Sequence, residues 1–163
     1  MLFRSEPLSA ARSVPETARR MLDVGSGGGS PAIPLALASG SLRLLMVESR
    51  TKKAVFLREA ARLVYLDAEV ANARVEELSV RPELRESQDL VTTRAVRLDV
   101  AMLTLLQTFL APDGQLFLFG SRGALPPADS LPAQIRFSGS RSLLTAANPS
   151  QLVLLKKQKP ATH

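Results

Sequence analysis

The chain has 163 residues, of which 45% are hydrophobic and 22% charged, and it carries a formal net charge of +6. This composition is typical of a globular α/β protein, and no apolar run approaches the ~20 residues that a bilayer span requires. Cysteine is absent, which excludes disulfides, thiolate nucleophiles and cysteine-ligated metals. The only histidine is His163, the last residue, so we expect neither a metal site nor Ser-His-Asp catalysis. The first twenty residues lack the apolar core of a signal peptide, so we expect a cytoplasmic protein.

Charge is unevenly distributed along the chain. Residues 41–63 carry six Lys or Arg against two acids, and residues 64–93 carry three against seven. Residues 134–163 carry five bases and no acid. The chain thus has two basic zones on either side of an acidic middle, and its pI is near 10.5. This distribution of charge favours a polyanion as the partner. A merely solvated surface is the alternative.

Short apolar segments bounded by turn residues predict seven β-strands, at residues 20–25, 42–49, 68–74, 89–96, 114–120, 133–139 and 150–158. Helices are predicted between them at residues 31–39, 51–66 and 98–114. Apolar strands that alternate with helices predict an α/β fold, with a doubly wound, mostly parallel seven-stranded sheet. We expect one domain over residues 1–163, with a short amino-terminal segment (1–20) and a core over 20–158.

The turn after the first strand is rich in glycine. The sequence "DVGSGGGS" matches the pattern D-x-G-x-G-x-G with Asp23, Gly25, Gly27 and Gly29, the form that S-adenosylmethionine (SAM) enzymes use. In open α/β sheets, ligands bind beyond the carboxyl ends of the strands, where a glycine turn lets the backbone approach them closely. Ser26 lies within this turn and is included among the cofactor-binding candidates.

Glu48 lies at the end of the second predicted strand, nineteen residues after Gly29. An acid at this point can accept hydrogen bonds from both hydroxyls of an adenosyl ribose. Two alternatives remain open: a nicotinamide dinucleotide, or a tight turn without a ligand in which Glu48 caps a helix.

The acceptor of a methyl group is narrowed by exclusion. Methylation at C5 of a pyrimidine requires a cysteine, which is absent, and the (Asp/Asn/Ser)-Pro-Pro-aromatic turn of exocyclic-amine enzymes is replaced by "TTRAV". A ring nitrogen such as guanine N7 already carries a lone pair, so its methylation needs positioning and charge stabilisation rather than a general base. Arg94 suits this catalytic role, because its planar guanidinium can hold a guanine edge or a phosphate. An exposed arginine, or one paired with an acid of residues 76–89, is the alternative.

Six segments of the chain, together with their order and spacing, resemble the GidB/RsmG family of bacterial 16S rRNA guanine-N7 methyltransferases. They are "DVGSGGGSPAIPLALA", "ESRTKKAVFLREAARL", "ARVEEL", "DLVTTRAV", "LFLFGSRG" and "SQLVLLKK". The resemblance implies a Rossmann-like class I methyltransferase fold, with SAM as methyl donor and S-adenosyl-L-homocysteine as product. It also implies that the methyl acceptor is a guanine of the 530 loop, within 16S rRNA, the 30S subunit or an assembly intermediate. It implies no association with a membrane.

By position, the resemblance places SAM contacts at Gly25, Ser30, Val75, Glu76 and Arg94. It places RNA contacts at three basic residues next to Glu48, namely Arg50, Lys52 and Lys53. Arg122 stands close to where the family has a lysine before glycine, and it is a further RNA-binding candidate.

The chain departs from the family before the first strand, where about twenty residues replace a longer helical segment. The resemblance therefore implies a shortened amino-terminal region. Alternatives are a non-catalytic SAM- and RNA-binding member of the family, and a SAM-dependent methyltransferase acting on a small molecule or protein.

Overall fold

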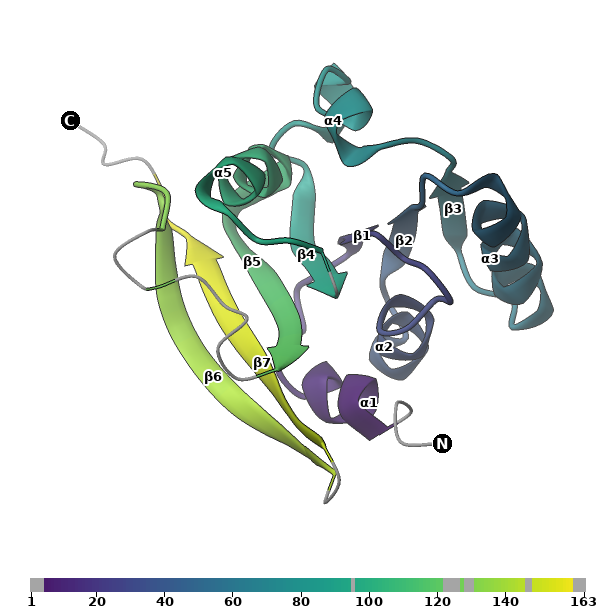
Figure 1. Cartoon of the computed structure of the whole chain (residues 1–163), viewed down its shortest axis with the longest axis horizontal. Helices are drawn as coiled ribbons and strands as arrows, with labels where there is room; N and C mark the ends of the chain where they lie inside the picture. Colours follow the sequence, from purple (N-terminus) through teal and green to yellow (C-terminus); the bar gives the residue numbers. More distant parts are fainter. Residues whose placement is uncertain (1–4, 95, 122–126, 128–130, 146–147, 160–163) are drawn as a thin grey trace.

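The computed structural model describes residues 5–94, 96–121, 127, 131–145 and 148–159. A seven-stranded sheet in the order β3-β2-β1-β4-β5-β7-β6 forms the middle of the molecule (Figure 1). Its strands are β1 (Arg20–Val24), β2 (Arg43–Val47), β3 (Ala68–Ala71), β4 (Gln88–Arg94), β5 (Leu110–Ser121), β6 (Ile135–Thr145) and β7 (Asn148–Lys157). β1 to β5 are parallel, and β7 is antiparallel to both β5 and β6. The predicted doubly wound, mostly parallel sheet is confirmed.

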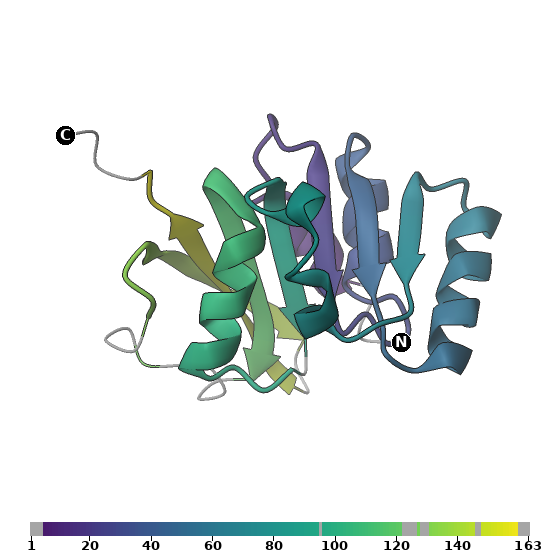
Figure 2. The ribbon, with the colours of Figure 1, turned by 90° about the horizontal axis from the view of Figure 1, so that it is seen from above.

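Helices cover both faces of the sheet. They are α1 (Ser5–Ala11), α2 (Ala32–Ser39), α3 (Thr51–Leu63), α4 (Val75–Leu78) and α5 (Val100–Phe109), with a short 3₁₀ turn, η2 (Pro82–Leu84). In Figure 1, α1 and α2 lie below the sheet and α4 and α5 above it; seen from above in Figure 2, α4 and α5 stand in front of the strands. Among the described residues, no helix is long and apolar enough to cross a membrane.

Local sequence accounts for the helices that were predicted. α3 buries Ala54, Leu57 and Ala61, which share one face of the helix. α5 begins after Asp99, whose side chain accepts a hydrogen bond from the Met102 N–H at 2.9 Å, as an N-cap residue does. α1 was not predicted from the sequence.

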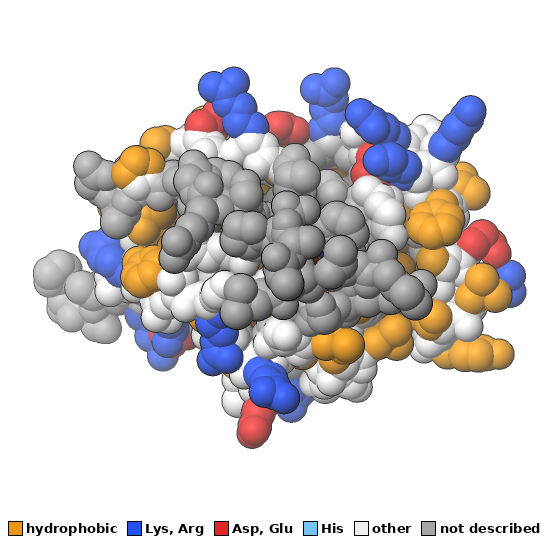
Figure 3. Space-filling model, turned by 60° about the horizontal axis from the view of Figure 1, so that its bottom comes forward, with side chains coloured by type: hydrophobic (Ala, Val, Ile, Leu, Met, Phe, Trp, Pro, Cys, Tyr) orange, Lys and Arg blue, Asp and Glu red, His pale blue; other side chains and the backbone are white. Residues whose placement is uncertain are grey.

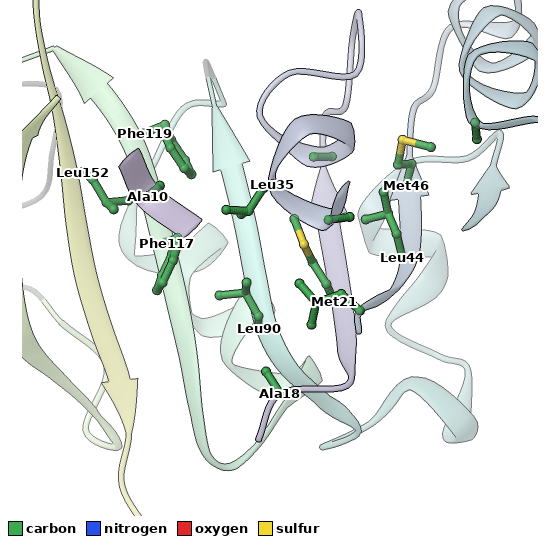
Figure 4. Packing of buried hydrophobic residues seen from close by; sticks show 14 of the residues in the cluster. Ala10, Ala18, Met21, Leu35, Leu44, Met46, Leu90, Phe117, Phe119 and Leu152 are labelled. Carbon is green, nitrogen blue, oxygen red and sulfur yellow. The ribbon is translucent and has the colours of Figure 1, made fainter. Parts of the chain in front are cut away.

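The core consists of two apolar clusters, one on each face of the sheet. Alternate residues of a strand point to opposite faces, so Met21 packs with α1, α2 and α3, whereas Leu22 packs with α4 and α5. Figure 4 shows the first cluster, in which Ala10 of α1 lies near Phe119 and Leu152. α1 is therefore part of the core on this face.

The chain reverses its direction of winding at β1. It proceeds from β1 to β2 and β3 on one side, and then returns to place β4 on the other side of β1. The carboxyl ends of β1 and β4 therefore flank the topological switch point, where ligands bind in open α/β sheets. The predicted glycine turn follows β1 at this point.

Candidate functional site

The glycine loop after β1 has a backbone that glycine alone adopts readily. Gly25, Gly27 and Gly29 have φ angles of 73°, 53° and 86°. The N–H groups of Gly25 and Ser26 donate to the carbonyl of Val47, at 2.9 and 3.1 Å, which ties the loop to the end of β2. The loop is thus held in one shape at the switch point.

Glu48 connects this loop to α3. Its Oε2 accepts a hydrogen bond from the Gly27 N–H at 2.9 Å, and its Oε1 accepts one from the Arg50 N–H at 2.8 Å. The side chain of Asn72 donates to the carbonyl of Glu48 at 3.0 Å and so fixes the backbone at the end of β2. Glu48 is 7% exposed. It therefore braces the loop, a contact that its expected role toward a ribose did not include.

Asp23 lies buried between β1 and β4 and is 1% exposed. Thr92 donates its hydroxyl hydrogen to Oδ1, whereas Oδ2 has no hydrogen-bond partner among the described residues. Burial raises the pKa of Asp23 to about 6, although the hydroxyls of Ser26 and Thr92 and the positive charge of Arg94 oppose this shift. The Ser26 hydroxyl donates to the Asp23 carbonyl at 3.1 Å. One carboxylate oxygen of Asp23 is thus buried without a hydrogen-bond partner among the described residues.

A cavity of about 230 Å³ adjoins the glycine loop. It brings together four of the predicted cofactor-binding residues, Gly25, Glu48, Val75 and Glu76. Val75 is buried, whereas Glu76 is exposed in the first turn of α4. The other predicted cofactor-binding residues, Asp23, Ser26, Gly27, Gly29, Ser30 and Arg94, do not line this cavity.

Arg94 at the end of β4 pairs with an acid that the sequence did not indicate. Its Nη2 forms an ion pair with Glu6 of α1, and its Nη1 lies 3.4 Å from the Ser30 hydroxyl oxygen. The guanidinium also stands 5.9 Å from the centre of the Phe119 ring. Arg94 is 20% exposed at its side chain, so it is neither an exposed arginine nor one paired with an acid of residues 76–89. Glu6 lies 88 residues away in sequence, and no sequence pattern signals the pair.

The three basic residues next to Glu48 lie at the start of α3. Arg50 is the N-cap residue, Lys52 and Lys53 lie in the first turn, and all three are exposed. The first turn contains no acid, although the positive end of a helix dipole favours one. In Figure 3, Lys and Arg side chains project along the upper margin, above a right-hand side rich in hydrophobic side chains. Arg122, the fourth RNA-binding candidate, lies outside the described residues.

Similar solved structures define the class of fold. The chain matches a putative methyltransferase, yhhF, from Escherichia coli with a TM-score of 0.71 and 16% identity, covering 97% of this chain and 87% of that one. It matches the O-methyltransferase TomG from Streptomyces achromogenes, solved in complex with SAM, with a TM-score of 0.71 and 16% identity, over 96% and 79% of the two chains. The fold is the Rossmann-like class I methyltransferase fold.

The chain belongs to the GidB family, rRNA small subunit methyltransferase G, whose model matches residues 5–147. It is 40% identical over 109 residues to ribosomal RNA small subunit methyltransferase G of Pelotomaculum thermopropionicum, covering 66% of this chain and 44% of the relative. It is 33% identical over 148 residues to the protein of the same name in Sorangium cellulosum, covering 88% and 62%. The chain thus spans from 44 to 62% of these two relatives.

Proposed function

We propose that the protein transfers a methyl group from SAM to N7 of a guanine in the 530 loop of 16S rRNA. Family membership and the names of its relatives support this proposal. The observation that carries it is the glycine loop at the switch point, which Glu48 joins to α3 and which adjoins a cavity. A glycine loop in this place is suited to a ligand that must approach the backbone.

The residues of the site fit the chemistry of SAM, which supplies an electrophilic methyl group on a positively charged sulfur. Oδ2 of Asp23, buried and without a partner among the described residues, is suited to accept hydrogen bonds from the ligand's ammonium group. A β-carbon on Gly25 would lie 2.8 Å from Cγ2 of Val96, so only glycine keeps this wall open. A carboxylate has about four lone-pair positions, so Glu48 can accept from ribose hydroxyls as well as from the backbone.

Arg94 is the residue that we assign to the substrate side. Guanine N7 needs no general base, because its lone pair is available at neutral pH, so the protein has to orient the base and stabilise charge. The guanidinium of Arg94 lies at the end of β4, where its planar donors suit guanine O6 or a phosphate. Glu6 and Ser30 hold this side chain, which reduces the freedom that it would lose on binding.

The start of α3 is suited to the RNA backbone. Arg50, Lys52 and Lys53 add three positive charges to the positive end of a 13-residue helix dipole. Such an arrangement attracts phosphate groups, and affinity for RNA should therefore fall steeply with salt concentration.

Transfer of labelled methyl from SAM to 30S subunits of a strain that lacks the modification tests the proposed function. The product base is identified by mass spectrometry, and we expect N7-methylguanine at a single position. Absence of transfer, with SAM binding intact by calorimetry, would contradict catalysis and favour a protein that binds SAM and RNA without turnover. Transfer to a small molecule or a protein instead of the 30S subunit would contradict the RNA substrate.

A further inference from the structure

The second basic zone of the sequence has no place in the site described above. The structure brings part of it together around a cavity of about 530 Å³, lined by Arg136 and Phe137 near the start of β6 and by Lys156 and Lys159 near the end of β7. Asp113, which also lines this cavity, precedes the part of β5 that pairs with β7 from Gln115 onward. Because β5 is parallel to β4, this cavity lies at the amino-end edge of the sheet, opposite the glycine loop.

The register of the strands places like charges next to each other here. Arg136 of β6 lies directly opposite Lys156 of β7. Like charges in a cross-strand pair destabilise a sheet unless an anion lies between them. Asp113 is the carboxylate at this point, 3.3 Å from Nζ of Lys156 and 3.0 Å from Nζ of Lys159. One carboxylate is thus shared by two lysines.

The other cations of this region differ in how they are satisfied. Lys157 is 3% exposed and donates to Glu86 at 2.6 Å and to the Leu110 carbonyl at 2.9 Å, so its charge is used within the fold. Arg136 donates to the backbone carbonyls of Ala133 and Ile135, and within the described residues no acid forms a salt bridge with it. Arg136, Lys156 and Lys159 therefore face a single carboxylate, which leaves an excess of positive charge.

Phe137, which follows Arg136 in β6, also lines this cavity, and it is 56% exposed. A large exposed aromatic costs solvation unless it has a partner, and unpaired RNA bases stack on such rings. Cations next to an exposed ring are suited to RNA, because its phosphates can bind the cations and its bases can stack on the ring. A small inorganic anion would use the charges alone.

We propose that Arg136, Phe137, Lys156 and Lys159, which we name the hairpin surface, bind the RNA substrate at a second place, away from the methyl-transfer site. This inference rests on the proposed function, because it takes RNA as the ligand. Gly114, which follows Asp113 within β5, and Ser121 at the carboxyl end of β5 are seven residues apart, which is roughly 23 Å at ~3.3 Å per residue. An RNA that contacts both edges of the sheet has to extend about seven stacked nucleotides from the target guanine, at ~3.4 Å each.

A short RNA should therefore reach only the methyl-transfer site, whereas a long RNA should also reach the hairpin surface. The first probe is a short stem-loop that contains the target guanine, and the second is full-length 16S rRNA without ribosomal proteins. Arg136→Gln combined with Lys156→Gln should weaken binding of 16S rRNA about threefold to tenfold at physiological salt and lower the salt slope by about two. Binding of the stem-loop should not change. Lys52→Ala with Lys53→Ala at the start of α3 should weaken binding of both RNAs.

Asp113→Asn is the matched control variant, because it removes a negative charge from the same surface and should change RNA binding in the opposite direction. Asp113 has a φ angle of 67°, a conformation that asparagine also adopts readily, so the backbone is kept while the negative charge is removed. This variant should bind 16S rRNA about threefold more tightly, with a steeper salt dependence. A local structural defect should weaken binding at this surface, whereas removal of a negative charge should strengthen it, so the direction of the change separates charge from structure. Thermal melting and SAM calorimetry of each variant check that the fold is retained.

Unchanged binding of 16S rRNA by the Arg136 and Lys156 double variant would overturn the hairpin surface. Equal effects on the stem-loop and on 16S rRNA would also overturn it. A variant that is impaired only on the 30S particle, and not on naked rRNA, would assign the surface to a ribosomal protein instead. If the wild type transfers no methyl group, but the double variant still weakens binding of 16S rRNA and not of the stem-loop, the proposed function fails and the hairpin surface stands. If the wild type transfers methyl normally and the double variant binds 16S rRNA as the wild type does, only the hairpin surface is overturned.

Discussion

Glu6 of α1 and Arg94 of β4 form an ion pair that ties the first helix of the chain to the switch point of the sheet. The Glu6 side chain is 6% exposed and that of Arg94 is 20% exposed, so the pair lies largely out of water. α1 also packs on α2, and Ala10 belongs to the core. The helix before β1 thus fixes the orientation of the arginine that we assign to the substrate.

Replacing Glu6 with alanine should destabilise the fold by about 3 kcal/mol, because Arg94 would keep its charge in a mostly buried place without its partner. Replacing Glu6 and Arg94 together by apolar residues should cost less than the single change. Urea unfolding measures both values. Glu59→Ala, which breaks the exposed Glu59–Arg62 pair, is the control and should change stability by less than about 0.5 kcal/mol. A Glu6 variant as stable as this control would contradict the importance of the pair.

Gly25 and Gly28 provide a test of the glycine loop at the level of single atoms. Gly25→Ala places a β-carbon 2.8 Å from Val96 at a φ angle of 73°, whereas a β-carbon on Gly28 meets nothing within 4 Å. We expect Gly25→Ala to cost about 1–2 kcal/mol in stability and to weaken SAM binding at least tenfold, because the side chain occupies the wall of the cavity. Gly28→Ala should behave like the wild type. Calorimetry with SAM decides, and equal affinity of the two variants would show that the cavity is not the cofactor site.

The strands were predictable because buried parallel strands are continuous apolar segments. β2 and β4 follow this rule, and both were expected within two residues of their bounds. β6 was expected to end at residue 139 and extends to Thr145. A register shift between Phe137 and Gly139 breaks the alternation of the strand, so its second half carries no period-two signal.

Features that depend on distant parts of the chain were not predictable. α1 has seven residues with a proline at its third position, and an isolated helix of this length is not stable in water. It exists because it packs on α2 and the sheet. From the sequence, Glu48 was expected either to bind a ribose or to cap a helix. Its bond from the Arg50 N–H at the start of α3 resembles the second role, whereas its bond from Gly27 in the glycine loop was not expected.

Lys52→Ala combined with Lys53→Ala should weaken RNA binding about tenfold and reduce the salt slope by about two, while SAM affinity stays unchanged. Both lysines are exposed at the start of α3, and neither lines the cavity beside the glycine loop. Arg58→Ala combined with Arg62→Ala is the control, since it removes the same charge from the second half of the same helix. Titration at several salt concentrations measures the slopes. Equal losses in both double variants would indicate a general effect of net charge rather than a site.

The raised pKa of Asp23 predicts how both stability and SAM binding change with pH. The folded protein holds a proton on Asp23 up to about pH 6, whereas the unfolded chain releases it near the ordinary value of 3.8. The stability that this group contributes is therefore fully present below pH 3.8 and is lost as the pH rises through 6, by about 3 kcal/mol in all.

Asp23→Asn removes this titration. The stability of the variant relative to the wild type should rise by about 2 kcal/mol between pH 4 and pH 7. Glu86 and Asp113 have lowered pKa values, chiefly through hydrogen bonds from Lys157 and Lys159, and their opposite effect is common to both proteins and cancels in the difference. SAM binding to the wild type should tighten as the pH rises through 6, because only the carboxylate attracts the ligand's cationic groups; in the variant it should be weak at every pH. Parallel stability curves for the two proteins would show that Asp23 is ionised in the free protein throughout this range, and the pH dependence of SAM binding would then need another origin.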